Sequence, residues 1–178
     1  MLIPLLIVVN CHLIPASDDT QFVKEKTVQV GTCQDDELAI EGGVSFVNAR
    51  GGKDVIIDKS ADSTRFQGGS GNDVFYSGPG NDVYYGGLGY DLYIFDGPFG
   101  TDQIVDMAFV GPDKLIFMNY VVGSLTEDLI RNQLTRREGE HLIIDLTGVI
   151  GFGGSKLYLL IMSDSRFKNL SIEVRLSR

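Results

Sequence analysis

The sequence predicts a mainly β protein made of short strands joined by tight, glycine-rich turns. Three observations support this fold class. Glycine makes up 22 of the 178 residues, and ten of these glycines lie between Ala61 and Asp106. The same segment holds seven acidic residues and one basic residue. It also contains a nine-residue repeat, and self-similarity at a fixed period is typical of repeat architectures.

Three nine-residue units follow one another without a gap, at 68–76 (GGSGNDVFY), 77–85 (SGPGNDVYY) and 86–94 (GGLGYDLYI). Each unit has an aspartate at its sixth position and an aromatic residue two positions later. A fourth unit follows with two extra residues, and the same pattern recurs at about twice the interval before the first unit. The aspartates of this register, each two residues before an apolar residue, are Asp36, Asp54, Asp73, Asp82, Asp91 and Asp102.

These units resemble the RTX, or haemolysin-type, calcium-binding repeat GGxGxDxUx. The units 68–76 and 86–94 match it fully, and 77–85 departs from it only at Ser77. The resemblance implies a calcium-stabilised parallel β-roll, in which two units form one coil and the strands alternate between two facing sheets. Because successive strand residues point to opposite faces, the second residue after each aspartate is expected in the core. These residues are Leu38, Ile56, Phe75, Tyr84, Tyr93 and Ile104.

The resemblance also implies Ca²⁺ ions held between two loops on the same edge, one coil apart. One ion is expected between 68–73 and 86–91, with Asp73 and Asp91 as carboxylate ligands. Calcium prefers six to eight oxygen ligands, so backbone carbonyls complete the set. Those expected are the carbonyls of Gly68, Ser70, Gly86 and Leu88.

A second ion is expected between Asp82 and Asp102, with Gly78 and Gly80 in the adjoining loop. A third is expected between Asp54 and Asp73. Both outer loops depart from the repeat, because two residues are inserted before Asp102 and the GGKD sequence at Asp54 is two residues short. A solvated turn aspartate is therefore the alternative at each. Asp58 lies outside the register, and its removal is expected to change little.

The charge pattern predicts that bound calcium stabilises the fold. Carboxylates stacked ~5 Å apart repel by roughly 3 kcal/mol at an effective dielectric constant near 20. A bound cation reverses that sign, so that the free energy of binding becomes free energy of folding. The alternative is a set of glycine- and Asx-rich hairpin turns that binds nothing.

Three regions are expected: an N-terminal segment (1–30), an RTX β-roll (31–106) and a C-terminal β-rich cap (107–178). The start of the chain is partly like a secretory signal, with a buried first strand as the alternative, and Cys11 and Cys33 allow one disulfide. Beyond the repeats, the Ser124–Glu127 capping box predicts a helix to about Leu134. Strands are expected at 113–119, 141–148, 156–162 and 170–176, and this order loosely resembles the tails of serralysins and alginate epimerase R-modules.

The function expected is a non-catalytic, secreted calcium-binding module that folds on binding Ca²⁺ outside the cell. The net charge of −9 disfavours nucleic acid as a partner, and no stretch reaches the ~18 apolar residues of a membrane span. No HExxH or GxSxG motif is present, so any catalytic domain is expected outside this chain. Two alternatives stay open: the C-terminal module of an extracellular metalloprotease, lipase or alginate epimerase, and a glycan-binding or adhesin module using the outward Tyr76 and Tyr85.

Overall fold

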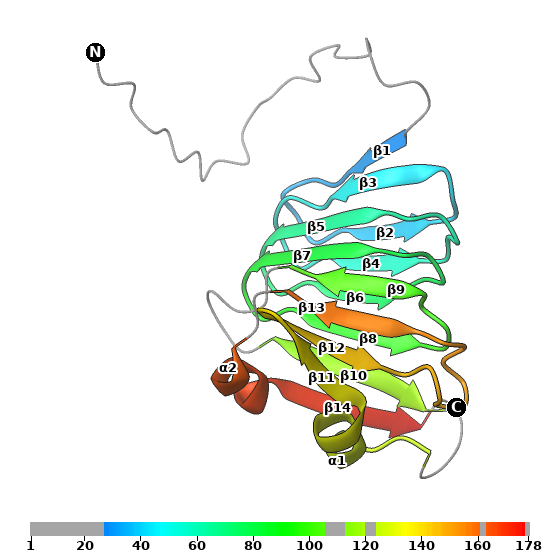
Figure 1. The fold of residues 1–178 in the computed structure, drawn as a ribbon. Coiled ribbons are helices and arrows are strands. Elements are labelled where there is room, and N and C mark those ends of the chain that lie inside the picture. Colours follow the sequence, from blue (N-terminus) through cyan, green and yellow to red (C-terminus); the bar gives the residue numbers. More distant parts are fainter. Residues whose placement is uncertain (1–26, 106–112, 120–123, 161–162, 177–178) are drawn as a thin grey trace.

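The computed structural model describes residues 27–105, 113–119, 124–160 and 163–176, and Figure 1 shows them as a roll of stacked strands. The expected secretory signal or first strand, together with Cys11, lies outside these ranges. Cys33 is disulfide-bonded. In the described ranges, no helix has the length and apolar character needed to cross a bilayer.

The strands of the described chain form two facing sheets (Figure 1). Their bounds are β1 Thr27–Val30, β2 Glu37–Ile40, β3 Val44–Asn48, β4 Val55–Asp58, β5 Arg65–Ser70, β6 Val74–Ser77, β7 Val83–Leu88, β8 Leu92–Asp96, β9 Thr101–Ile104, β10 Lys114–Asn119, β11 Thr135–Glu138, β12 His141–Asp145, β13 Lys156–Leu159 and β14 Ser171–Leu176. The eight-stranded sheet has the order β1-β3-β5-β7-β9-β13-β12-β11, and the six-stranded sheet has the order β14-β10-β8-β6-β4-β2. The predicted parallel β-roll is therefore confirmed.

Strand pairing follows the repeat register. Val74 lies opposite Val55 on one side and Leu92 on the other, in parallel pairs one coil apart. The second residue after each repeat aspartate is buried in every coil, as predicted: Leu38, Ile56, Phe75, Tyr84, Tyr93 and Ile104.

Aromatic rings stack between coils inside the roll. The ring centroids of Phe75 and Tyr93 are 5.1 Å apart and nearly parallel, and Phe66 and Tyr84 repeat this arrangement at 5.1 Å on the other sheet. Fully buried aromatic rings contribute large apolar areas to a core. The column therefore ties each coil to the next through side chains as well as backbone hydrogen bonds.

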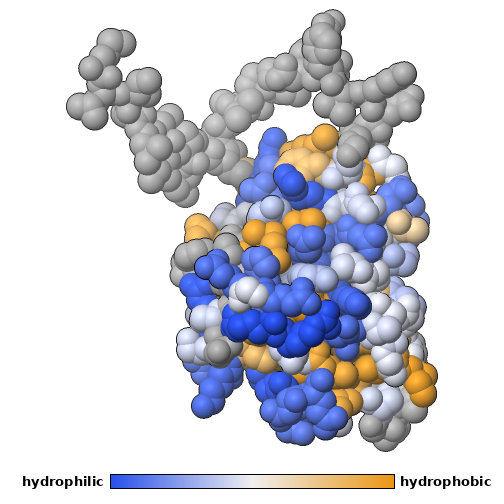
Figure 2. All heavy atoms as spheres, in the orientation of Figure 1, coloured by the Kyte–Doolittle hydropathy of each residue, from blue (hydrophilic) through white to orange (hydrophobic). Residues whose placement is uncertain are grey.

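The C-terminal part continues both sheets. β13 adds to β9 and β14 adds to β10, both in parallel, whereas β12 and β11 follow in antiparallel pairs. β11 is an edge strand with exposed charged residues, and Figure 2 shows hydrophilic side chains gathered over it. Charged edge strands resist pairing with other chains.

The predicted helix is shorter and begins later than expected. Its N-cap is Thr126, not Ser124, because the Thr126 side chain accepts a hydrogen bond from the Leu129 amide. A short α1 (Glu127–Leu129) passes into a π-helical turn, η1 (Ile130–Leu134), which buries Ile130. A second helix, α2 (Asp164–Asn169), was not expected from the sequence.

Candidate metal centre

The loops that lead from the eight-stranded to the six-stranded sheet lie above one another, and we call them the first loop column. One aspartate of each loop accepts a backbone hydrogen bond from the preceding coil. The Asp54 amide donates to Asp73 Oδ1 at 2.9 Å, and the Asp73 amide donates to Asp91 Oδ1 at 3.0 Å. Asp36 donates likewise to Asp54, and Asp91 to Asp113. The register aspartates thus form a continuous ladder.

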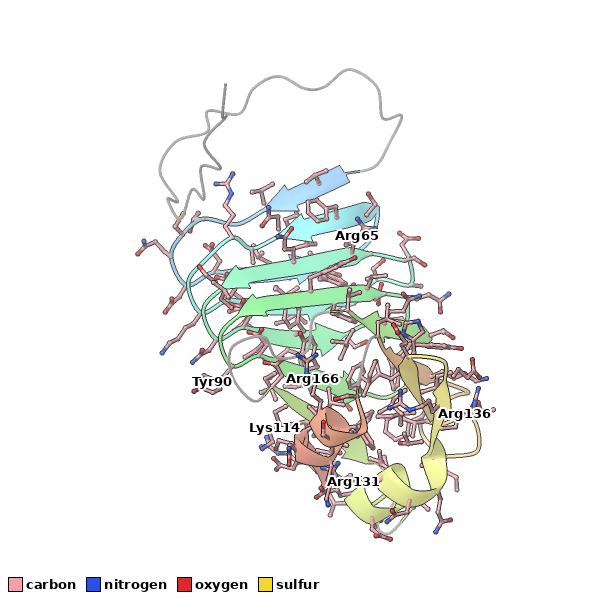
Figure 3. All side chains as sticks on the ribbon, turned by 60° about the vertical axis from the view of Figure 1, so that its left-hand side comes forward. Arg65, Tyr90, Lys114, Arg131, Arg136 and Arg166 are labelled. Carbon is pink, nitrogen blue, oxygen red and sulfur yellow. The ribbon has the colours of Figure 1, made fainter. Side chains whose placement is uncertain are left out.

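The ladder occupies only one oxygen of each carboxylate. Asp54 and Asp73 are fully buried, with 0% exposure, and Oδ2 of each has no hydrogen-bond partner. Burying a charged oxygen without a compensating partner is costly. Among the described residues, no lysine or arginine forms an ion pair with either carboxylate. Lys114, Arg131, Arg136 and Arg166 lie toward the C-terminal end of the roll (Figure 3).

The second oxygen of Asp73 lies where two coils meet. A Cβ on Gly68 would meet Asp73 Oδ2 and would lie 2.7 Å from the Gly86 carbonyl oxygen. A carboxylate oxygen of one loop and a carbonyl oxygen of the next therefore converge beside a residue without a side chain. Two other expected ligands, the carbonyls of Ser70 and Leu88, accept inter-coil hydrogen bonds from the Gly52 and Gly71 amides.

The electrostatics of this column follow from burial and stacking. The pKa of Asp73 is raised to about 7, chiefly by burial; the Asp54 amide opposes the shift, and the neighbouring charges of Asp91 and Asp54 contribute to it. The pKa of Asp54 is also raised, chiefly by burial. A stack of buried carboxylates with raised pKa values favours either protonation or a bound cation.

The loop that ends at Asp54 has its full length, which corrects the expectation that it is two residues short. Gly51 pairs with Ser70 in the next coil, so that Ala49 and Arg50 occupy the first two positions of the repeat. Arg50 has a φ of 75°, where the matching Gly69 has 108°. The loop could not be recognised from the sequence, because Arg50 adopts the left-handed conformation at a position where the repeat has glycine.

The loops that run from the six-stranded sheet back to the eight-stranded sheet form the second loop column. The Asp82 amide donates to Asp102 Oδ1 at 2.9 Å, which repeats the ladder of the first column. Asp102 Oδ2 accepts a hydrogen bond from the Ser77 hydroxyl at 2.7 Å. Burial raises the pKa of Asp102 to about 9. The two-residue insertion leaves Asp102 in register, because it places Phe99 in the core.

Asp58 lies outside the nine-residue register, as the sequence indicates, yet its side chain is buried beside the second loop column. It lies at the end of β4 with 5% exposure, because the strand places its side chain on the inner face beside the second loop column. The pKa of Asp82 is raised to about 7, chiefly by burial, and the charge of Asp58 contributes to the shift. The nine-residue register could not indicate Asp58, because the residue lies at the first position of its loop and not at the sixth.

A further set of residues was missed, although the repeat contains their signal. The fifth loop position hydrogen-bonds along each column through its side chain. Asn72 Oδ1 accepts from the Tyr90 amide at 3.0 Å, Asn81 Oδ1 from the Thr101 amide at 2.7 Å, and Asp35 Oδ1 from the Lys53 amide at 2.8 Å. The recurring Asn-Asp dipeptide reflects this second ladder.

The outer tyrosines differ in exposure. Tyr76 is 39% exposed, whereas Tyr85 is half-buried and the Arg65 guanidinium lies 5.8 Å from its ring centroid. A cation over an aromatic face at this distance is a stabilising contact within the sheet surface. Tyr90, at 58% exposure, projects away from the roll (Figure 3).

The donors of both columns fit a hard cation. Within the described ranges, no three His, Cys, Asp or Glu side chains form a metal-binding group, so a site here combines one or two carboxylates with carbonyl oxygens. Calcium accepts carboxylate and carbonyl oxygens in flexible geometry, whereas zinc and other transition metals favour imidazole and thiolate ligands. The buried Asp54 and Asp73 oxygens are the strongest sign of this fit.

A match to a known protein family agrees with this donor chemistry. The model of the RTX calcium-binding nonapeptide repeat, in four copies, matches residues 60–93. Among solved structures, the extracellular lipase LipA from Serratia marcescens is similar over 81% of this chain, with 22% sequence identity and a TM-score of 0.38. The matched region is 20% of the lipase chain. No curated protein matches the chain.

Proposed function

Because residues 60–93 are RTX calcium-binding nonapeptide repeats, we propose that this chain is a non-catalytic module that works outside the cell and folds when it binds Ca²⁺. The observation that carries the proposal is the buried second oxygen of Asp73, which has no hydrogen-bond partner and faces the Gly86 carbonyl. A calcium ion beside Gly68 would compensate this charge and join two neighbouring coils.

The ligands proposed for this ion are Asp73 Oδ2 and the Gly86 carbonyl, with Gly68 leaving the space. Asp91 repeats this arrangement one coil later, because its Oδ1 accepts from the Asp73 amide and a Cβ on Gly86 would meet its Oδ2. The same relation repeats one coil earlier, where Asp54 Oδ2 is buried without a hydrogen-bond partner. Asp54 is therefore proposed as a ligand and not as a solvated turn residue.

Export and folding are linked in this proposal. Without a cation, stacked carboxylates oppose the packing of one coil on the next. At low calcium the chain would stay largely unfolded, and at extracellular calcium it would fold. Ligand binding to the folded form alone stabilises it by RT ln(1 + [L]/Kd), so the ion concentration sets the folded fraction.

A calcium titration followed by far-UV circular dichroism tests the proposed function. We expect a cooperative gain of β structure with a midpoint of ~10⁻⁴ to 10⁻³ M, the range of extracellular calcium modules. Chelator should reverse the gain, and magnesium at the same concentration should not produce it. Identical spectra with and without calcium would show that the repeats do not couple binding to folding.

A further inference from the structure

The second loop column lacks one aspartate of the repeat. The position that matches Asp82 one coil earlier is Thr64, whose amide donates to Asp82 Oδ1 at 2.8 Å as an aspartate amide would. Threonine keeps the backbone ladder but brings no carboxylate. On the repeat pattern alone, this coil has no charged ligand on that edge.

A carboxylate nevertheless reaches the same space from another position. β4 pairs with β6 so that Ile57 lies opposite Tyr76, which brings Asp58 to the level of Ser77, the first residue of the next loop. Asp58 is 5% exposed. Its Oδ1 accepts from the Ser60 amide at 2.8 Å, its Oδ2 receives no hydrogen bond from a donor group, and its carboxyl lies beside that of Asp82.

The second oxygen of Asp58 faces the following coil. A Cβ on Gly78 would lie 2.8 Å from Asp58 Oδ2 and 2.9 Å from the Ser60 carbonyl oxygen. Two residues further on, a Cβ on Gly80 would meet the Asp62 carbonyl oxygen and would lie 3.0 Å from Asp82 Oδ1. Two carboxylates and two carbonyls from successive loops thus lie against Gly78 and Gly80, where any added side chain would be crowded.

We infer that Asp58 is a cation ligand that replaces the missing repeat aspartate, and that it forms a Ca²⁺ site with Asp82 and the carbonyls of Ser60 and Asp62. This inference rests on the proposed function and extends it to a ligand outside the nine-residue pattern. The donors are all oxygens, which favours calcium over zinc or copper. No lysine or arginine in the described ranges forms an ion pair with Asp58 or Asp82.

Asp102 does not belong to this site. Both of its oxygens accept hydrogen bonds, one from the Asp82 amide and one from the Ser77 hydroxyl. The Ser77 bond to Asp102 Oδ2 is short, at 2.7 Å, whereas Asp82 Oδ2 accepts only from the Tyr84 hydroxyl at 3.5 Å. Asp82 is therefore the better calcium ligand of the two, because a hydrogen bond of 3.5 Å is weak. The ion expected between Asp82 and Asp102 is therefore reassigned to Asp82 and Asp58.

The test compares the full chain with Asp58→Asn, Gly78→Ala and the control Asp96→Asn. Asparagine retains an oxygen acceptor for the Ser60 amide, whereas alanine at position 78 keeps the Asp58 carboxylate but crowds it, since its Cβ would lie 2.8 Å from Asp58 Oδ2. Asp96 is an exposed aspartate at the end of β8. Equilibrium dialysis gives the number of bound calcium ions, and circular dichroism gives the calcium midpoint of folding.

We expect Asp58→Asn and Gly78→Ala each to bind one ion fewer and to fold at a several-fold higher calcium concentration, while Asp96→Asn behaves as wild type. Wild-type stoichiometry in Asp58→Asn or in Gly78→Ala would overturn the assignment. If Asp58→Asn fails to fold, the ion count of Gly78→Ala decides alone. A wild-type chain that binds no calcium would instead contradict the proposed function, so the two failures are distinguishable.

Discussion

The carboxylate of a repeat aspartate has two different oxygens in this fold. In Asp54 and Asp73, Oδ1 accepts a backbone hydrogen bond from the preceding coil and Oδ2 is buried without a hydrogen-bond partner. Asparagine would serve the first role as well as aspartate does. The charge is therefore needed only for the second role, and this separation makes the two roles testable by a single substitution.

Asp73→Asn is expected to raise the calcium midpoint of folding several-fold and to lower the melting temperature in calcium. The amide retains an acceptor for the Asp54 amide, so the loss reflects the missing ligand charge and its linkage contribution. Melting curves and calcium titrations of this variant measure the effect. The control is Glu37→Gln, at an exposed position of β2. An unchanged calcium midpoint in Asp73→Asn would mean that Asp73 serves only as a hydrogen-bond acceptor in the ladder and not as a calcium ligand.

At the scale of the element, the tight turns place severe demands on their second position. Arg50 adopts a φ of 75° where the next coils have Gly69 and Gly87. A left-handed conformation costs a non-glycine residue roughly 1–2 kcal/mol. The backbone carbonyl of Arg50 lies against Gly69, so the coils stack closely there whichever residue occupies position 50.

Arg50→Gly is expected to stabilise the calcium-loaded protein by up to ~1 kcal/mol, because glycine adopts this conformation freely but loses more entropy on folding. This corresponds to a rise of about 2–4 °C in melting temperature for a chain of this size. Arg50→Ala is the matched control, since it removes the guanidinium and keeps the Cβ. A melting temperature for Arg50→Gly no higher than that of Arg50→Ala would contradict the conformational account.

The repeat predicts the elements well where its period holds. The inward residues two places after the repeat aspartates and the parallel pairing could be predicted, because they follow from strand alternation and a fixed interval. The full length of the loop at Asp54 and the inward Phe66 could not, because Arg50 and Thr64 replace the glycine and the aspartate of the repeat. The Ser124–Glu127 pattern failed, since Thr126 two residues later caps the helix instead. Asp58 and η1 were beyond prediction, because the burial of Asp58 and Ile130 depends on contacts far away in sequence.

At the scale of the whole molecule, the roll is an acidic stack held between two sheets. Folding buries the carboxylates of Asp73, Asp82 and Asp102 and raises their pKa values to about 7, 7 and 9. Each of these groups binds its proton more tightly in the folded chain than in the unfolded one. Protons and calcium ions are thus alternative ways to neutralise the same stack of carboxylates.

The sign of the pH dependence follows from these raised pKa values. Because the folded chain holds more protons than the unfolded chain between about pH 4 and 9, stability without calcium should fall as the pH rises through this window. We therefore expect a larger folded fraction, measured by circular dichroism, at about pH 6 than at about pH 8 in calcium-depleted buffer. Saturating calcium should weaken or reverse this trend, since it replaces the proton. A calcium-free folded fraction that rises from pH 6 to pH 8 would contradict the raised pKa values.

The central claim is that the buried second oxygens of the loop aspartates hold calcium between neighbouring coils. The most direct test is a crystal structure of the full chain grown in millimolar calcium, with anomalous diffraction to identify the ions. The account predicts an ion about 2.3–2.6 Å from Asp73 Oδ2 and from the Gly86 carbonyl oxygen, the usual calcium–oxygen distance. A well-ordered loop at 68–73 with no anomalous peak beside Gly68 would contradict it.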